Sequence, residues 1–270
     1  MSKTILQGLI GAWCPSLGPS GYTLLDRSGR GQHGTLTNMD AGTDWVGTSG
    51  GWALDFDGTN DYVSVPNRLS YTSGQWLSVS AWFKRNVTSA YHEIINKFNG
   101  TSAANEDGWL VRVTNGNKLL FTIGQSGSYG QFESTGTYTD TAWHHIMVSL
   151  CVGAGSTLKM WYDGAEVALS ATGTVNAVPD IDATAYAINI GAQRYAGVSY
   201  NLLNGQVGDC AIWHAPKTAV DARQLYQSGR GGLGRLLTPQ RRSYAFRVPA
   251  AAVKSYLFTN RGQVIGGGTL

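Results

Sequence analysis

Hydrophobic residues recur along this chain in short runs, and turns rich in glycine, asparagine and aspartate separate the runs. The stretch 76–85 shows the clearest alternation between hydrophobic and partly polar positions. One face of an extended strand there would carry Leu77, Val79, Ala81 and Phe83, and the other face Trp76, Ser78, Ser80 and Trp82. This period of two predicts a strand with one face in a core and one partly polar face.

Similar runs predict twelve strands in all. They lie at residues 9–13, 53–56, 62–65, 76–85, 93–98, 109–114, 118–123, 131–134, 143–152, 158–162, 187–191 and 205–213. Asn115-Gly116 and Asp163-Gly164 are expected to supply the positive φ angles of two tight hairpin turns. So many short strands need two packed sheets.

One short helix is expected to begin at Thr218 and to end near Gly229. The Thr218 hydroxyl would cap free backbone amides, and the side chain of Asp221, three residues later, would bond back to the start of the helix. The glycines that follow indicate an extended arm, because so few apolar residues cannot bury a core of their own. The sequence therefore predicts a sandwich over residues 1–228 and an arm over 229–270.

Composition supports a chain of strands and turns. It holds 36 glycines, 13 tyrosines and nine tryptophans but only four glutamates. No window approaches the ~18 consecutive apolar residues of a membrane span, and residues 1–7 lack the pattern of a secretory signal, so we expect no membrane contact and no export by that route. Three cysteines without metal-site spacing exclude a full disulfide framework and are expected to be free, buried thiols.

The charge is unevenly distributed. Residues 1–221 hold 12 basic and 17 acidic residues, whereas residues 222–270 hold eight basic residues and no acid. The end of the chain is therefore electrically distinct from its body.

Several segments, taken in order, resemble laminin-G-like jelly-roll domains of the concanavalin A-like superfamily of lectins and glucanases. They read GLIGAW at 8–13, DRSGRGQHGTL at 26–36, WALDFDGTNDYV at 52–63, LSVSAWF at 77–83, WHHI at 143–146, MWYDG at 160–164 and GQVGDCAIW at 205–213. The resemblance spans roughly residues 5–227. It implies an all-β fold, a two-sheet antiparallel jelly-roll sandwich with one short C-terminal helix and an extended basic tail.

The resemblance says less about function, because the fold hosts lectins, adhesins, hydrolases and spacers. It implies calcium as the candidate ion, held by Asp209 with backbone near Gly51 or Gly11, and with Asp57 as a weaker ligand. Cys210 replaces the second acid of the family pair, which weakens this inference. In the alternative, the aspartates at 55, 57 and 61 bond only their own turn.

Glycoside hydrolysis needs two carboxyl groups on either side of one bond, and no strand here carries the paired acids of the glucanases. His144 and His145 would point to opposite faces of a strand, so they are expected to be structural. Nucleophile-elbow, zinc-protease and phosphate-loop motifs are absent from the sequence. We therefore expect no enzyme and no required cofactor.

A carbohydrate site would combine exposed aromatic rings, which stack on sugars, with side chains that read hydroxyl groups. Candidate loop residues are Tyr91, Tyr129, Gln193, Arg194, Tyr195 and Tyr200. Most aromatic residues of a sandwich are core residues, and that reading stays open for each of these.

The basic tail has three readings: a solvated end, a nucleic-acid contact or an arm that docks on a partner protein. Arginines interleaved with aromatic residues favour docking. The docking candidates are Arg235, Arg241, Arg242, Tyr244, Phe246, Arg247, Tyr256 and Phe258. No nucleic-acid recognition motif accompanies the charge.

The leading hypothesis is a non-enzymatic structural or binding module, anchored by its arm to a larger assembly. Domains of this kind without export signals occur in bacteriophage structural proteins, so the resemblance implies a virion protein made in the host cytoplasm, with capsid or tail proteins as partners. The alternatives are a carbohydrate-binding lectin or adhesin, with or without calcium, and more remotely a glycoside hydrolase.

Overall fold

The computed structural model describes residues 3–66, 70–100, 107–125, 128–173, 181, 186–238, 257–258 and 264–265. The chain divides into two compact units, Met1–Thr238 and Pro239–Leu270. Within the second unit, strands β20 (Leu257–Phe258) and β21 (Val264–Ile265) pair antiparallel.

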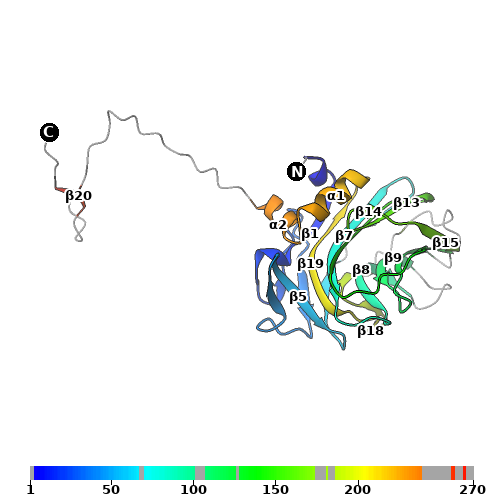
Figure 1. Cartoon of the computed structure of the whole chain (residues 1–270), viewed down its shortest axis with the longest axis horizontal. Helices are drawn as coiled ribbons and strands as arrows, with labels where there is room; N and C mark the ends of the chain where they lie inside the picture. The colour runs from blue at the N-terminus through cyan, green and yellow to red at the C-terminus, as the bar shows by residue number, and fades with distance from the viewer. Residues whose placement is uncertain are drawn as a thin grey trace. The chain divides into compact units, whose positions relative to one another are not determined.

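The first unit contains two large antiparallel sheets that pack face to face (Figure 1). The eight-stranded sheet has the order β14 (Ala165–Glu166), β13 (Ala154–Tyr162), β12 (Trp143–Cys151), β7 (Trp76–Arg85), β19 (Asn204–Trp213), β5 (Gly51–Asp57) and β4 (Trp45–Thr48), and β1 (Leu9–Trp13) also pairs with β19.

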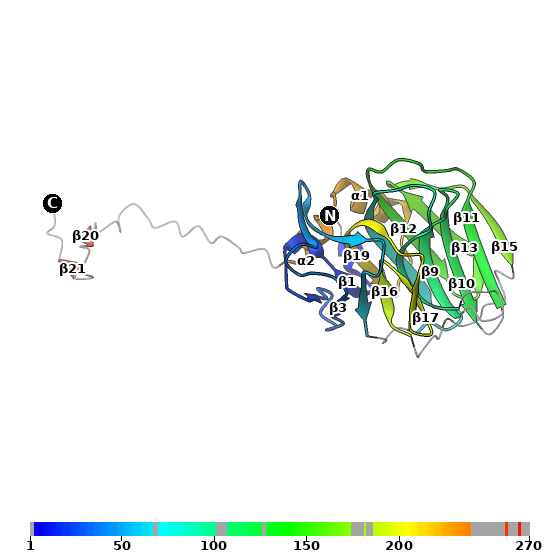
Figure 2. The ribbon, with the colours of Figure 1, turned by 90° about the horizontal axis from the view of Figure 1, so that it is seen from below.

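The nine-stranded sheet lies opposite, and Figure 2 shows several of its strands side by side. Its order is β15 (Leu169–Gly173), β11 (Ser128–Ser134), β10 (Leu119–Gln125), β9 (Asp107–Val113), β8 (His92–Asn99), β16 (Ile188–Ile190), β6 (Tyr62–Val65), β3 (Gly34–Thr37) and β2 (Thr23–Leu24). A small separate hairpin joins β17 (Gln193–Tyr195) to β18 (Val198–Tyr200). This arrangement confirms the predicted two-sheet sandwich.

The main core lies between the sheets. Leu77 and Phe83 of β7 belong to it, and so do Phe121 and Ile123 of β10 on the opposing sheet. All four side chains are almost fully buried, so they contribute about 1.5–3 kcal/mol each in hydrophobic burial. The alternation along 76–85 therefore predicted the inward face correctly.

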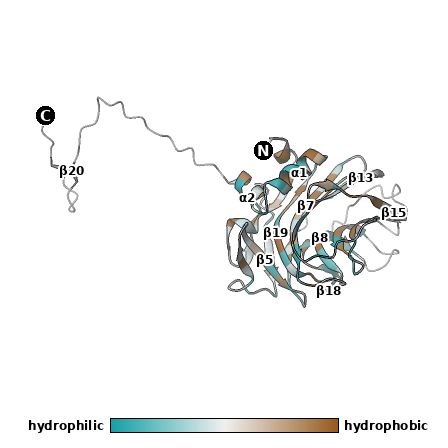
Figure 3. Ribbon diagram, in the orientation of Figure 1, coloured by the Kyte–Doolittle hydropathy of each residue, from teal (hydrophilic) through white to brown (hydrophobic). Residues whose placement is uncertain are grey.

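Helical segments cover the outer face of the eight-stranded sheet. They are η1 (Lys3–Leu6), α1 (Ala219–Gln227) and α2 (Gly232–Leu237). Leu225 of α1 and Leu233 of α2 pack with Trp213 of β19 in a second apolar cluster. The hydropathy colouring in Figure 3 shows both hydrophobic and hydrophilic residues along α1. Its N-terminus has the predicted capping box of Thr218 and Asp221.

The predicted start of the arm at residue 229 is wrong, because the first compact unit continues to Thr238. Arg230 and Leu233 are buried, and α2 lies where the extended arm was expected to begin. The glycines permit close packing here: a Cβ on Gly234 would lie 2.6 Å from the Ser16 hydroxyl oxygen. Five of the eight basic residues of the C-terminal stretch remain in the second unit.

Most predicted docking residues lie outside the described part of the chain. These are Arg241, Arg242, Tyr244, Phe246, Arg247 and Tyr256. Phe258 is in β20. Arg235 is in α2, where its guanidinium donates to the Ser228 carbonyl oxygen at 2.7 Å.

The two predicted turns differ in outcome. Asp163 and Gly164 have φ angles of 52° and 76°, as expected for a tight hairpin. In the hairpin of β9 and β10 the positive φ lies at Asn117, at 60°, and not at Asn115-Gly116. A three-residue loop explains the difference, because a type I turn followed by one left-handed residue closes such a loop.

All three cysteines are free; Cys14 and Cys210 are buried and Cys151 is half-buried. Among the helices that the structure describes, none combines the length and apolar character needed to cross a membrane.

Candidate functional site

Two rows of side chains cross the outer face of the nine-stranded sheet. One row is formed, strand by strand, by Glu93, Arg112, Leu120, Glu133 and Ser170. The next row contains Leu110, Thr122, Gln131 and Thr172. Because side chains alternate along a strand, both rows point away from the core face that carries Phe121.

Two adjoining hollows lie over these rows, and together they are called the outer groove. The smaller, of about 260 Å³, extends to Phe98 and to Gln193 and Tyr200 of the β17–β18 hairpin. The larger, of about 670 Å³, extends to Tyr91, the β9–β10 turn and Thr172. Both hollows are lined by Arg112, Leu120, Gln131 and Asn201. The volume of the larger hollow is in the usual range of small-ligand sites.

Two tyrosines give the outer groove exposed aromatic surface. Tyr91 is 41% exposed and lines the larger hollow, and Tyr200 is 39% exposed and lines the smaller one. The guanidinium carbon of Arg112 lies 5.9 Å from the centroid of the Tyr91 ring, within cation–π range. The arginine therefore supports the position of the tyrosine.

Arg112 is held from two further sides. Its Nε lies 3.0 Å from Oε2 of Glu93, and its Nη2 donates to Oε1 of Gln193 at 2.7 Å. Asn201 donates to the same Gln193 oxygen at 2.8 Å, and Gln193 donates to the Gly100 carbonyl oxygen at 2.6 Å. The side-chain amide of Gln193 therefore holds two groove residues, Arg112 and Asn201, and is itself bonded to the backbone at Gly100.

The charged groups of the groove form pairs. Besides the pair of Glu93 and Arg112, the ammonium of Lys118 lies 2.9 Å from Glu133 Oε2. Glu93 is fully buried, and burial raises the pKa of its carboxyl group to about 7 against the lowering effect of Arg112. A substantial fraction of Glu93 is therefore protonated near neutral pH.

Three of the six residues predicted for sugar contacts lie together in the outer groove: Tyr91, Gln193 and Tyr200. Arg194 stacks over the Tyr62 ring at 4.6 Å and donates to the Ser199 hydroxyl, so it is not brought to the groove. Tyr129 and Tyr195 do not line either hollow.

Sequence reasoning missed Arg112, Lys118, Gln131, Glu133 and Asn201, which line the groove. The available signal was the predicted hairpin of residues 109–114 and 118–123. Its alternation places Arg112 and Leu120 on the face opposite the core. The sequence does not, however, predict the register with which the following strand, residues 128–134, pairs with this hairpin.

The candidate calcium residues are only partly brought together. Oδ1 and Oδ2 of Asp209 accept the backbone N–H groups of Ser16, at 3.3 Å, and Gly234, at 2.8 Å. Gly51 also approaches Ser16, since a Cβ on it would lie 2.8 Å from the Ser16 carbonyl oxygen. Asp57 is at the other end of β5, roughly 20 Å along the strand from Gly51.

Asp57 instead bonds its own turn, accepting the N–H of Thr59 at 2.7 Å. Nowhere in the described ranges do three histidine, cysteine or acidic side chains cluster closely enough to hold a metal ion. Calcium binding at Asp209 stays a prediction.

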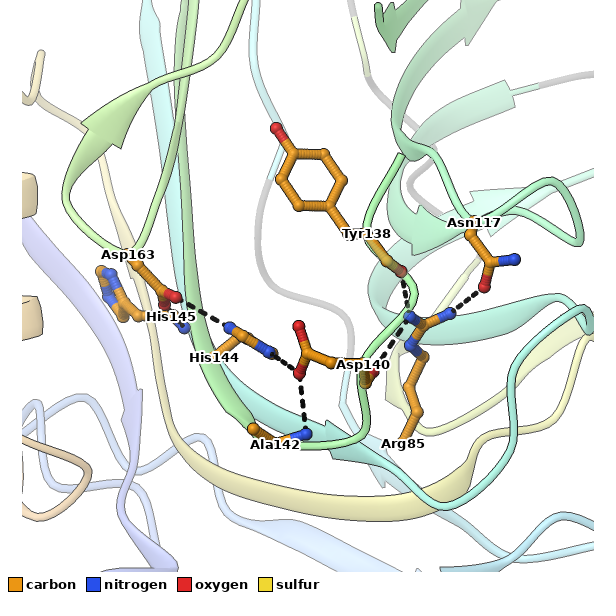
Figure 4. Close-up of polar contacts among 8 residues, drawn as sticks. All are labelled: Arg85, Asn117, Tyr138, Asp140, Ala142, His144, His145 and Asp163. Carbon is orange, nitrogen blue, oxygen red and sulfur yellow. Dashed lines mark hydrogen bonds and ion pairs between the residues drawn. The ribbon is translucent and has the colours of Figure 1, made fainter. Parts of the chain in front are cut away.

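His144 and His145 face opposite sides of the sheet, as predicted. Figure 4 shows His144 between two carboxylates, with its Nδ1 2.7 Å from Asp163 and its Nε2 2.5 Å from Asp140. Burial lowers the pKa of His144, but hydrogen bonds to these carboxylates outweigh that effect and the net shift is upward. When protonated, this imidazole can donate from both nitrogens to the two carboxylates, which explains the upward shift of its pKa.

Arg85 holds the loop before β12, which carries Tyr138 and Asp140. Its guanidinium donates to Asn117 Oδ1 at 2.9 Å and to the Tyr138 carbonyl oxygen (Figure 4). The histidine cluster therefore connects the loop before β12 to the β13–β14 turn, and we interpret it as structural.

A family model described as the concanavalin A-like lectin/glucanases superfamily matches residues 57–223, more than half of the chain. The chain belongs to this superfamily. The laminin-G-like resemblance seen in the sequence is thereby confirmed. No curated protein sequence matched the chain.

Solved structures similar to this superfamily member include three with sugar-related titles. A botulinum neurotoxin type C structure, titled for cell entry through two ganglioside molecules, is 17% identical with a TM-score of 0.58, and the match covers 83% of this chain and 52% of that one. The binding domain of botulinum neurotoxin serotype D with N-acetylneuraminic acid is 15% identical, with a TM-score of 0.56 and coverage of 84% and 52%.

A sialidase mutant from Trypanosoma rangeli is 12% identical with a TM-score of 0.54, over 86% of this chain and 34% of that one. The superfamily member therefore spans about half the length of the toxin structures and about a third of the sialidase. At these identities the likeness shows the fold.

Proposed function

We propose that this protein is a carbohydrate-binding module without enzymatic activity, and that its ligand lies in the outer groove. The observation that carries the proposal is the groove itself, where the exposed rings of Tyr91 and Tyr200 accompany a sheet face of hydroxyl, amide and charged groups.

The chemistry of the groove suits a sugar. A tyrosine ring offers a flat apolar face to the C–H groups of a pyranose, and its cost in conformational entropy is low. Thr122, Gln131 and Thr172 lie in one row along the groove floor and offer donors and acceptors for hydroxyl groups. Orientation by a few polar groups over a partly apolar floor is the usual form of a small-ligand site.

The spacing of acids opposes hydrolysis in this groove. Glu93 and Glu133 are the glutamates of the sheet face, and they are three strands apart in the same row. Strands lie about 4.8 Å apart, so the two positions are separated by roughly 14 Å. Glycosidases need about 5–9.5 Å between their carboxyl groups.

The comparisons agree with a binding role. The titles of the toxin structures name gangliosides and N-acetylneuraminic acid as molecules bound by those proteins. Because the match covers about half of each toxin chain, their sugar sites are not located by it. The proposal for this chain rests on its own groove. The virion location and the capsid or tail partners inferred from the sequence stay predictions.

A glycan array followed by titration of the best ligand tests the proposal. Tyr91→Ala and Tyr200→Ala should each weaken binding roughly two- to thirteenfold, if a ring stacked on a sugar contributes about 0.5–1.5 kcal/mol as a stacked aromatic pair does. Tyr22→Ala is the matched control, because Tyr22 is 61% exposed and does not line the groove. Retention of no glycan, or equal affinity of all three variants and the wild type, would overturn the proposal.

A further inference from the structure

The most unusual group of the outer groove is a carboxylate beneath its floor. Glu93 has no exposed surface, and its counter-charge is the guanidinium of Arg112 at 3.0 Å. Its polar side-chain neighbours are Arg112 and Asn96, and among the described residues neither makes a hydrogen bond of good geometry to a Glu93 oxygen. Burying a carboxylate with so few partners is costly, and protonation relieves that cost.

Arg112 connects this buried acid to the groove. It lines both hollows, while its Nε is directed to Glu93 and its Nη2 to Gln193. The guanidinium is rigid and planar and has five N–H groups, so with one on Nε and one on Nη2 so directed, those on Nη1 and the second on Nη2 can face a ligand carboxylate. An arginine held in place before the ligand arrives pays little entropy when it binds one.

We propose that Arg112 is a subsite for the carboxylate of an acidic sugar, such as a sialic or uronic acid, and that binding there is coupled to protonation of Glu93. This inference rests on the proposed function and names the ligand class. The ligand anion takes over the charge of Arg112, and Glu93 takes a proton from solvent, so the net charge of the site is unchanged.

The surroundings of Glu93 single it out as the titrating group. From β9 it meets Arg112, and from its own strand the neutral amide of Asn96. Its neighbour His92 is neutral, because burial lowers the pKa of that imidazole to about 4. The β17–β18 hairpin contributes the uncharged Gln193. Lys118 and Glu133 pair with each other in the larger hollow.

The pH dependence follows from linkage. With the pKa of Glu93 near 7 in the free protein, the acid is mostly protonated below pH 7 and binding there takes up little or no proton. Above pH 7 the acid must first gain a proton. The affinity for an acidic glycan should therefore fall as the pH rises from 6.5 to 8, approaching tenfold per pH unit.

The test compares acidic and neutral ligands on the whole chain. A glycan array at pH 6 and pH 8, containing sialylated and uronic-acid glycans with their uncharged parents, identifies the binders. Calorimetry of the best acidic binder at pH 8, in buffers of different ionisation enthalpy, then measures proton uptake, which should approach one proton. Glu93→Gln should flatten the pH profile of acidic binding, and Arg112→Gln should remove the preference for acid.

The outcomes separate the acidic-sugar subsite at Arg112 from the proposed carbohydrate-binding function. Neutral glycans that bind as well as acidic ones, or acidic binding without proton uptake at pH 8, would overturn this inference and leave the proposed function standing. Retention of no glycan of either kind would overturn both. Circular dichroism confirms that each variant is folded, and the proton uptake of the wild type needs no variant.

Discussion

The carboxylate of Asp209 accepts the backbone N–H of Gly234, with 2.8 Å between Oδ2 and the nitrogen. Its other oxygen accepts the N–H of Ser16, in the 3-10 turn η2 (Pro15–Leu17). One buried side chain thus joins the N-terminal turn, strand β19 and helix α2. Burial raises the pKa of this carboxyl group to about 6, against the lowering effect of these hydrogen bonds.

Truncation should show where the folded unit ends. A chain that stops after Thr238 should unfold at the same urea concentration as the full chain. A chain that stops after Ser228 should lose roughly 3 kcal/mol, because it loses the burial of Leu233 and leaves Asp209 without the Gly234 donor. Equal stability of the two truncated chains would contradict this role for α2.

Calcium should not strengthen sugar binding. Asp209 bonds Gly234 of α2, on the outer face opposite the groove, and Asp57 is too far along β5 to join it, so a calcium ion at Asp209 would not reach a bound sugar. We expect the same glycan affinity in millimolar calcium and in excess EDTA, measured by titration. A calcium-dependent affinity that disappears in Asp209→Asn would support the calcium site inferred from the resemblance instead.

Stability should depend on pH through His144. Its pKa is raised above 6.5, so its contribution is complete below the unfolded value and is lost as the pH rises through the folded value. His144→Gln should therefore unfold with a shallower loss of stability between pH 6 and pH 8 than the wild type. Urea unfolding at several pH values measures both slopes, and parallel slopes would refute the ion-paired imidazolium.

Substitution of Asn117, whose backbone is left-handed, should change the stability of the protein according to the φ that the new residue allows. Asn117→Ala should be destabilised by about 1 kcal/mol more than Asn117→Gly. Both variants lose the acceptor for Arg85, so the difference reports the φ of 60° alone. Chemical unfolding of the pair measures it, and a more stable alanine variant would argue against the three-residue loop.

The sequence predicted those features that depend on local pattern. The alternation along 76–85 placed Leu77 and Phe83 in the core, and the capping signature of Thr218 placed α1. The position of the β9–β10 turn was right to within a residue or two, but the left-handed residue was not. An Asn-Gly pair also suits a two-residue turn, and the three-residue loop is decided by the pairing of the flanking strands.

Features that depend on distant contacts were not predictable. Arg112 becomes a groove residue only because Glu93 and Gln193, from other strands, come next to it. The glycines after residue 228 indicated an extended arm, and the contacts of Gly234 with Asp209 and Ser16 show that they allow close packing instead. Of the loop aromatic residues, sequence alone did not separate Tyr91 from Tyr129, because the difference lies in which strands pair.

The outer groove and helix α2 lie on opposite outer faces of the sandwich. The first unit could therefore be fixed to a support through α2 without covering the sheet that carries the proposed sugar groove. Several copies fixed in this way on one support would present their grooves together. A ligand that carries many sugars would then be held by effective concentration, even when each single contact is weak.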